Sequence, residues 1–202
     1  SNGKTTTVRL LAAMLRASGR VTGWCCSDGV WVDDAQLERG DFTGPGGTRR
    51  VISDQRVQAA VLEVARGGML RRGLAVSVAD AAIITNISAD HFGEYGVESL
   101  ADLARVKAIV ARALRPGASL ALNADDASLV SMAASPACAE IASQISWFSV
   151  QPSHGARALA THGRSYVITD DHRLVLFAAG STHDLGDVRE MPITLRGTAT
   201  HN

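Results

Sequence analysis

A glycine, a lysine and three threonines stand at positions 3–7, directly before a segment whose apolar residues recur at helical spacing. A glycine lets backbone N–H groups approach phosphate oxygens, and the positive end of the following helix attracts the same anion. Lys4 would then reach the β- and γ-phosphates of a nucleotide, and the Thr5 hydroxyl would bind Mg²⁺. A helix start capped by threonine is the simpler alternative. The nucleotide contacts expected from this stretch come from Asn2, Gly3, Lys4, Thr5 and Thr6.

The choice of basic residues singles out two positions. Of the 20 basic residues, 18 are arginine, and the two lysines are Lys4 and Lys107. A chain that uses arginine wherever a generic cation suffices is expected to keep lysine where a compact, acylatable amine is required. Lys107 flanks the apolar stripe of a predicted helix over residues 99–114. An ordinary lysine with its stem on apolar surface is therefore the alternative.

Carboxylate, amide and imidazole side chains follow the predicted strands. Glu63 comes near the end of the apolar run 59–64, and Asn86 near the end of the run 79–87, with His91 soon after. Open α/β sheets bind ligands at the carboxyl ends of their strands. Glu63 is thus a candidate Mg²⁺ ligand, and Asn86 and His91 are candidates at the same edge. A surface glutamate and a hydrogen-bonded structural histidine are the corresponding alternatives.

Apolar periodicity and turn residues predict an α/β fold of the P-loop type, with a mostly parallel sheet flanked by helices and a short β-hairpin region near the C-terminus. The first strand, which should precede the phosphate loop, is missing from the printed sequence. Four glycines and a proline predict an irregular loop over residues 40–47. The other predicted elements are a helix ending at Gly19, a strand over 21–26, a hairpin of 30–32 with 36–38, strands over 119–122 and 146–150, a helical stretch over 129–142, and a hairpin of 165–168 with 174–177.

Bulk composition excludes several classes of protein. The net charge is zero and the pI is about 7.0, so the chain has no electrostatic footprint for nucleic acid or anionic lipid. No apolar run approaches the roughly 20 residues of a membrane span. The three cysteines fit reduced thiols better than a disulfide framework or a zinc site. We therefore expect a cytoplasmic protein with neither nucleic-acid nor membrane partners.

Together these residues resemble the central domain of the ATP-dependent Mur ligase family. The resemblance covers essentially the whole chain, and its motifs follow the order of the family. They are residues 1–7, Glu63, the Thr-Asn-Ile-Ser-Ala-Asp-His run at 85–91, Lys107, the Asn-Ala-Asp-Asp run at 123–126 and the closing His201-Asn202. Within the family, the chain is similar to the cyanophycin synthetase branch over residues 40–47, 62–74 and 102–107.

This resemblance implies an amide-bond ligase that uses ATP and Mg²⁺ and works through an acyl phosphate. It implies catalytic roles for Lys4, His91 and Lys107. It implies metal ligation by Thr5, Glu63, His91 and Lys107, the lysine in carbamylated form. Asn202 would face the adenine, and Asn86 and the run 123–126 would line the site.

The implied partners are ATP, a carboxylate-bearing peptide or polymer, and an amino acid. In the cyanophycin synthetase branch the substrate is an Asp/Arg polymer, and a homo-oligomer of the full-length protein is compatible with the resemblance. Residues 1–202 would be the central ATPase domain, a fragment without its N-terminal strand and C-terminal ligase domain and therefore inactive alone. A peptidoglycan-type or folylpolyglutamate-type ligase, a non-catalytic nucleotide-binding module and a generic P-loop kinase are the alternatives.

Overall fold

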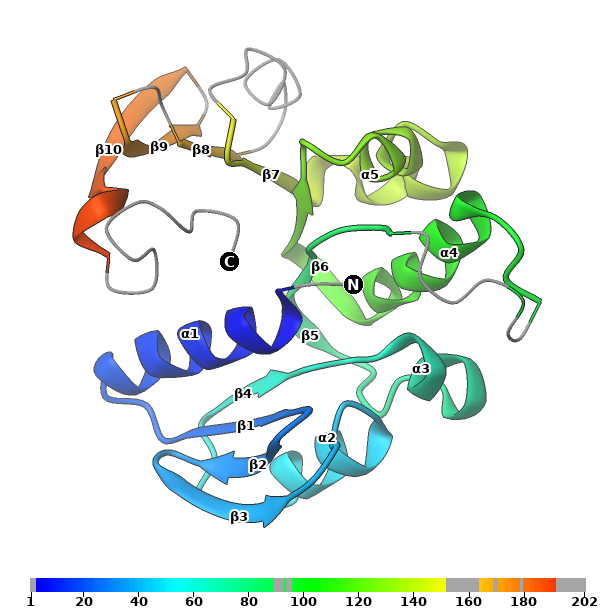
Figure 1. Cartoon of the computed structure of the whole chain (residues 1–202), viewed down its shortest axis with the longest axis vertical. Helices are drawn as coiled ribbons and strands as arrows, with labels where there is room; N and C mark the ends of the chain where they lie inside the picture. The colour runs from blue at the N-terminus through cyan, green and yellow to red at the C-terminus, as the bar shows by residue number, and fades with distance from the viewer. Residues whose placement is uncertain are drawn as a thin grey trace. The chain divides into compact units, whose positions relative to one another are not determined.

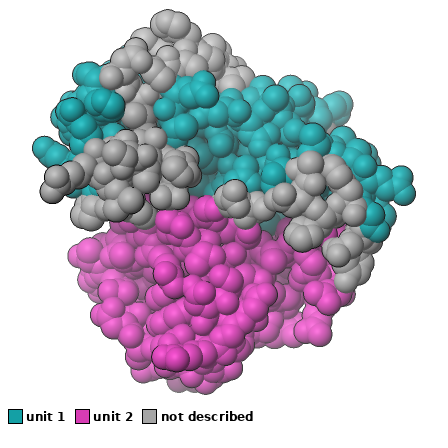
Figure 2. Space-filling view, in the orientation of Figure 1, with its two compact units in different colours: residues 1–2, 78–202 teal, residues 3–77 magenta. Residues whose placement is uncertain are grey.

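The computed structural model describes residues 3–88, 93, 96–151, 164–168, 171–178 and 180–191. The chain forms two compact units, which are coloured separately in Figure 2: one of residues 3–77, the other from residue 78 onward. Each unit has its own sheet and its own helices (Figure 1).

Residues 3–77 are built on a four-stranded sheet with the strand order β3-β2-β1-β4. Its elements are α1 (Lys4–Ala17), β1 (Thr22–Cys26), β2 (Gly29–Val32), β3 (Ala35–Arg39), α2 (Pro45–Ile52), β4 (Ala59–Leu62) and α3 (Arg66–Arg72). β1 is antiparallel to β2 and parallel to β4, and β2 and β3 form the predicted hairpin. Because β1 and β4 are parallel, the residues that follow them, Ser27 and Glu63, lie at the same edge of the sheet.

The helices α1 and α2 pack on opposite faces of this sheet. Side chains alternate along a strand, so β1 turns Trp24 and Cys26 to one face and Cys25 to the other. On the α1 face the buried residues are Val8, Ala12, Trp24, Cys26 and Val61. On the α2 face they are Cys25, Val30 and Val51. One apolar layer therefore holds α1 on its face of the sheet, and the other holds α2 on the opposite face.

The predicted irregular loop over residues 40–47 is wrong in its second half, because α2 begins at Pro45. Proline is favourable in the first turn of a helix, where its missing N–H leaves no hydrogen bond unmade. Position 47, within this helix, is occupied by glycine for a steric reason. A Cβ atom there would be 2.1 Å from the carbonyl oxygen of Phe42.

The second unit contains a six-stranded sheet with the order β10-β9-β8-β7-β6-β5. Its strands are β5 (Ala79–Ile84), β6 (Leu114–Asn123), β7 (Ile145–Ser149), β8 (Arg164–Ile168), β9 (Arg173–Ala178) and β10 (Ser181–Asp187), and its α-helices are α4 (Leu100–Lys107) and α5 (Ala127–Ala133). The strands β5 to β8 are parallel, and β8, β9 and β10 are antiparallel. The predicted class, a mostly parallel sheet with helices and a C-terminal hairpin, is confirmed.

The predicted helix over residues 99–114 is shorter than expected. It starts with a capping box in which Ser99 and Asp102 bond each other's backbone N–H, and it ends at Lys107. A 3-10 helix follows over Ala108–Ala113. Leu114, the last residue of the predicted helix, is instead the first residue of β6 and pairs with Ala79 of β5.

The core of the second unit is formed by aliphatic side chains. Leu120 and Leu122 of β6 and Leu129 of α5 are fully buried. Short 3-10 helices complete the described part, at Pro136–Gln144 and Val188–Glu190. Among the described residues, no helix combines the length and the apolar character needed to cross a bilayer.

Candidate functional site

Gly3, the residue before α1, has a left-handed backbone conformation. Gly3 has a φ of +83°, which a residue with a side chain adopts only at a cost. Its carbonyl oxygen accepts hydrogen bonds from the Thr7 backbone N–H at 2.9 Å and from the Thr7 hydroxyl at 2.8 Å. The N-cap has no side chain, and the first turn of α1 contains no acidic residue. The positive end of the helix is therefore available to an anion.

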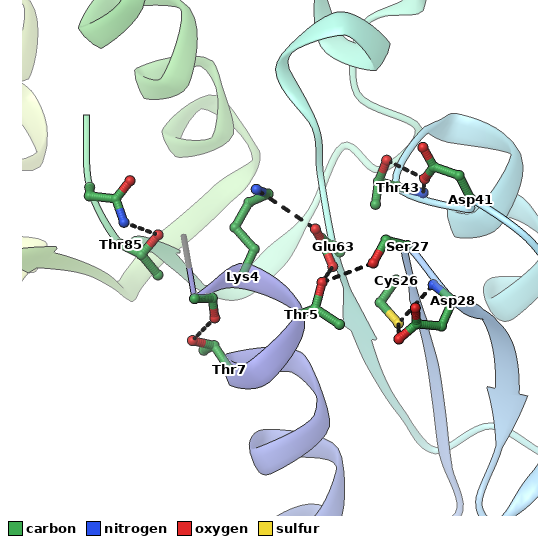
Figure 3. Close-up of polar contacts among 12 residues, drawn as sticks. Lys4, Thr5, Thr7, Cys26, Ser27, Asp28, Asp41, Thr43, Glu63 and Thr85 are labelled. Carbon is green, nitrogen blue, oxygen red and sulfur yellow. Dashed lines mark hydrogen bonds and ion pairs between the residues drawn. The ribbon is translucent and has the colours of Figure 1, made fainter. Parts of the chain in front are cut away.

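Three side chains from α1 and the end of β4 meet in the first unit (Figure 3). The Thr5 hydroxyl donates a hydrogen bond of 2.7 Å to Oε2 of Glu63. The Lys4 Nζ atom lies 3.9 Å from Oε1 of the same carboxylate. Glu63 is only 4% exposed, whereas the Lys4 side chain retains 32% of its exposure. The carboxylate is thus buried between two polar groups, with the lysine reaching toward solvent.

Ser27 is a neighbour of this group that the sequence analysis missed. It lies in the two-residue turn between β1 and β2, and its hydroxyl oxygen is 3.1 Å from that of Thr5. The next residue, Asp28, forms an ion pair with Arg9, one turn further along α1. No motif marks this serine, because the contact depends on the parallel pairing that brings the end of β1 beside α1.

The donor set around Thr5 fits Mg²⁺. This ion takes oxygen ligands, usually one or two from protein and the rest from phosphate and water. The Thr5 hydroxyl and the Glu63 carboxylate, 2.7 Å apart, supply two such oxygens. Within the described ranges, no group of three or more histidine, cysteine or acidic residues could hold a metal by itself. A magnesium ion bound by these two oxygens would take its remaining ligands from phosphate and water.

The two cysteines of β1 are unsuited to metal binding or nucleophilic attack. Both side chains are fully buried. Burial raises the pKa of the Cys25 thiol to about 12, and burial likewise raises the pKa of Cys26. Because the thiolate is the reactive and metal-binding form, both residues serve as small apolar side chains of the core.

A second polar group lies in the other unit, at the end of β5. The Lys107 Nζ atom, on the last residue of α4, donates a hydrogen bond of 2.5 Å to the carbonyl oxygen of Asn86. The Asn123 side chain donates to the carbonyl oxygen of Thr85 at 3.1 Å. Asp126 accepts from the Ile87 backbone N–H at 2.5 Å. The runs 85–91 and 123–126 were both predicted to lie at a sheet edge. Their described residues are in contact there.

The candidate residues of the sequence fall into three sets. Gly3, Lys4, Thr5, Thr6 and Glu63 belong to the unit of residues 3–77, with Thr6 in the first turn of α1. Asn86, Lys107 and the run 123–126 belong to the other unit. Asn2, Asp90, His91 and Asn202 lie outside the described residues.

Comparison with known proteins identifies the family. The model of the Mur ligase middle domain matches residues 1–169. The cyanophycin synthetase of Trichormus variabilis (strain ATCC 29413 / PCC 7937) is 34% identical over 200 residues, which are 98% of this chain and 22% of that protein. The UDP-N-acetylmuramoyl-L-alanyl-D-glutamate--2,6-diaminopimelate ligase of Chlorobaculum tepidum is 32% identical over 66% of this chain and 27% of its own length.

Solved structures show the same fold. A structure of UDP-N-acetylmuramoyl-L-alanyl-D-glutamate--2,6-diaminopimelate ligase covers 92% of this chain with a TM-score of 0.65 and 19% sequence identity, over 37% of its own chain. The present chain spans 22% and 27% of the lengths of the two curated relatives described above. Sequence and fold lead to one conclusion: the chain belongs to the Mur ligase family, whose middle domain it contains.

Proposed function

We propose that this chain is the ATP-binding part of a ligase that joins an amino acid to a carboxylate-bearing polymer, as a cyanophycin synthetase. The observation that carries the proposal is the group of Lys4, Thr5 and Glu63 at the start of α1. It combines a phosphate-binding helix end with a cation and two oxygen donors, which a nucleotide with Mg²⁺ requires. The similarity to cyanophycin synthetase over 98% of the chain favours this branch of the family.

In the proposed reaction, the terminal phosphoryl group of ATP passes to a substrate carboxylate, and ADP leaves. The amine of the incoming amino acid then attacks the carbonyl carbon of the acyl phosphate. An amide bond forms, and the carbon–oxygen bond to phosphate breaks. Phosphoryl transfer of this kind depends mainly on positioning and on neutralising negative charge. Mg²⁺, when bound, supplies part of that neutralisation.

The residues of the first unit have separate tasks in this proposal. Lys4 neutralises charge on the β- and γ-phosphates, and the backbone N–H groups after Gly3 hold their oxygens. Thr5 presents its hydroxyl oxygen as a ligand, and Glu63 accepts the hydroxyl hydrogen, which fixes the direction of the remaining lone pairs. Glu63 also contributes an oxygen ligand of its own.

The remaining candidates, outside the first unit, have proposed roles of their own. We assign His91 to metal binding and Asn202 to the adenine, as the resemblance implies. Lys107 is assigned to a second metal after carbamylation, which converts an amine into a carboxylate that arginine could not provide. In the unmodified chain the Lys107 amine donates a hydrogen bond to the Asn86 carbonyl oxygen. Carbamylation would modify this same amine.

The test uses the intact protein that contains this chain, with ATP, Mg²⁺, an Asp/Arg primer and either arginine or aspartate. We expect ADP release with growth of the polymer, measured by mass spectrometry. Lys4→Ala should slow growth by about 100- to 1,000-fold, the effect of removing one charge-stabilising group from an active site. Arg20→Ala is the control, because it removes an exposed cation beyond the far end of α1.

Two results would decide against parts of this proposal. Undiminished growth with Lys4→Ala would exclude the nucleotide role of the lysine. ADP release only with a muropeptide or folate acceptor would keep the ligase chemistry and replace the polymer substrate. The 32% identity to a diaminopimelate ligase makes a peptidoglycan acceptor the second candidate.

A further inference from the structure

The run Asn123–Asp126, here called the strand-end segment, begins at the last residue of β6 and lies between the ends of two neighbouring strands. β5, β6 and β7 are parallel, so their carboxyl ends lie at the same edge of the sheet. By its resemblance to the family, this segment is expected to line a ligand site. In the structure its three polar side chains bond to the protein instead.

One side of the strand-end segment holds the end of β5. The Asn123 amide donates to the carbonyl oxygen of Thr85 at 3.1 Å. The Asp126 Oδ2 atom accepts from the Ile87 backbone N–H at 2.5 Å. The other oxygen of Asp126 caps α5 by accepting from the backbone N–H groups of Ser128 and Leu129, at 2.9 and 3.2 Å. One carboxylate therefore joins the end of β5 to the start of α5.

The other side of the segment holds the end of β7. The Asp125 carboxylate accepts from the Ser149 hydroxyl at 2.6 Å and from the Val150 backbone N–H at 2.9 Å. Ser149 is only 3% exposed, whereas Asp125 is exposed, so this bond is partly buried. The Ala124 backbone N–H donates to the carbonyl oxygen of Phe148 at 2.8 Å. Asp125 and Asp126 are thus adjacent carboxylates with bonds to different strands.

The peptide group between Asn86 and Ile87 is bonded at both ends. Its carbonyl oxygen accepts from the Lys107 ammonium, and its N–H donates to the Asp126 carboxylate, each at 2.5 Å. A cation at the oxygen and an anion at the N–H both favour the same orientation of the peptide dipole. The position of the Lys107 amine is therefore coupled to Asp126 through a single peptide group.

We infer that Asp126 is a positioning residue that holds the Asn86–Ile87 peptide in place for Lys107. The strand-end segment then acts as a support of the candidate site and does not itself bind the nucleotide. The consequence for catalysis rests on the proposed function, whereas the coupling between Asp126 and Lys107 does not.

The test compares Asp126→Asn with Asp125→Asn in the intact protein. An amide has one oxygen, so the side chain introduced by Asp126→Asn cannot both cap α5 and accept from Ile87, although asparagine caps helices as well as aspartate does. The readout is the rate at which an acetylating reagent modifies the Lys107 amine in buffer freed of CO2, which leaves the amine uncarbamylated, followed by peptide mass spectrometry. Lys4, in the other unit, is the reference within the same sample.

We expect Asp126→Asn to raise the rate for Lys107 relative to Lys4 by roughly three- to tenfold, the range set by losing one hydrogen bond. The Lys107 amine must break its hydrogen bond to the Asn86 carbonyl oxygen before it reacts. A less firmly held peptide group makes that hydrogen bond weaker, so the amine reacts faster. Asp125→Asn makes the same chemical change one residue away, at the β7 side, and should leave the Lys107 rate unchanged. Equal acceleration in both variants, or none in Asp126→Asn, would overturn the inference.

A second measurement needs no variant. Hydrogen exchange at the Ile87 amide should be slow in the native protein, and exchange as fast as at an exposed loop amide would overturn the inference even if Asp126→Asn does not fold. The two proposals fail separately. A protein without ATP-dependent ligation would refute the proposed function, while the labelling rates would still decide the role of Asp126.

Discussion

Replacing Thr5 by valine should destabilise the protein more than the same change at Thr7, two residues further along α1. Both hydroxyls donate a hydrogen bond, Thr5 to the Glu63 carboxylate at 2.7 Å and Thr7 to the Gly3 carbonyl oxygen at 2.8 Å. Valine has nearly the same shape as threonine and is also β-branched, so packing and χ1 entropy change little. The two substitutions therefore differ mainly in the acceptor that each leaves behind.

The acceptors predict different magnitudes. Glu63 is 4% exposed and charged, and a hydrogen bond to a charged group contributes about 1.5–3 kcal/mol. The Gly3 carbonyl oxygen keeps its bond from the Thr7 backbone N–H at 2.9 Å, so Thr7→Val should cost about 0.5–1 kcal/mol. We expect Thr5→Val to lower the free energy of unfolding by about 1 kcal/mol more than Thr7→Val does.

Urea denaturation measures this difference directly, provided that the dependence on urea is the same for both variants. Titration of a fluorescent ATP analogue with Mg²⁺ adds a second comparison, in which Thr5→Val should weaken binding. Equal losses of stability in the two variants would show that water or another donor satisfies Glu63. The Thr5–Glu63 hydrogen bond would then stabilise the protein no more than the Thr7–Gly3 hydrogen bond does.

Gly47→Ala should lower the free energy of unfolding by about 1–3 kcal/mol, because its Cβ would lie 2.1 Å from the Phe42 carbonyl oxygen. Gly46→Ala, whose Cβ meets no atom within 4 Å, should raise it by up to about 1 kcal/mol, and equal urea midpoints would contradict both expectations. Burial raises the pKa of Cys25 to about 12, so folding favours the protonated thiol. The contribution of the protonated Cys25 thiol to the free energy of unfolding is therefore fully present below the ordinary pKa range of a thiol, and it should be lost as the pH rises toward 12. Rapid reaction of Cys25 with a disulfide reagent in the native chain would disprove the raised pKa.

The sequence predicted the elements whose signals are local. Gly19 follows the end of α1, with its φ of +84°, and the predicted pairings of β2 with β3 and of β8 with β9 form. The strand β10 was not predicted, because Ser181–Asp187 has mostly polar, exposed side chains and is a strand only through its pairing with β9. The predicted helix end at residue 114 was wrong for a related reason, because Leu114 pairs with Ala79 of the neighbouring strand β5.

The candidate site could be predicted as a set of residues but not as a set of contacts. The Gly-Lys-Thr pattern before a helix marked Lys4 and Thr5, and the end of a strand marked Glu63. Their side chains lie close together within the first unit. The contribution of Ser27 could not be seen, because it depends on which strand lies beside α1. For the same reason, no pattern in the sequence indicated that Asp125 and Asp126 bond to different strands.

The stacked indoles of Trp24 and Trp31 give the first unit an optical label. They are cross-strand partners on β1 and β2, with ring centroids 4.0 Å apart and planes within 4° of parallel. The third tryptophan of the chain, Trp147, is buried in β7 of the other sheet. Closely stacked indoles absorb as a coupled pair, so their circular dichroism should disappear when β1 and β2 separate. A single unfolding experiment could therefore report the loss of each sheet by a different signal, and so show whether the two units unfold together.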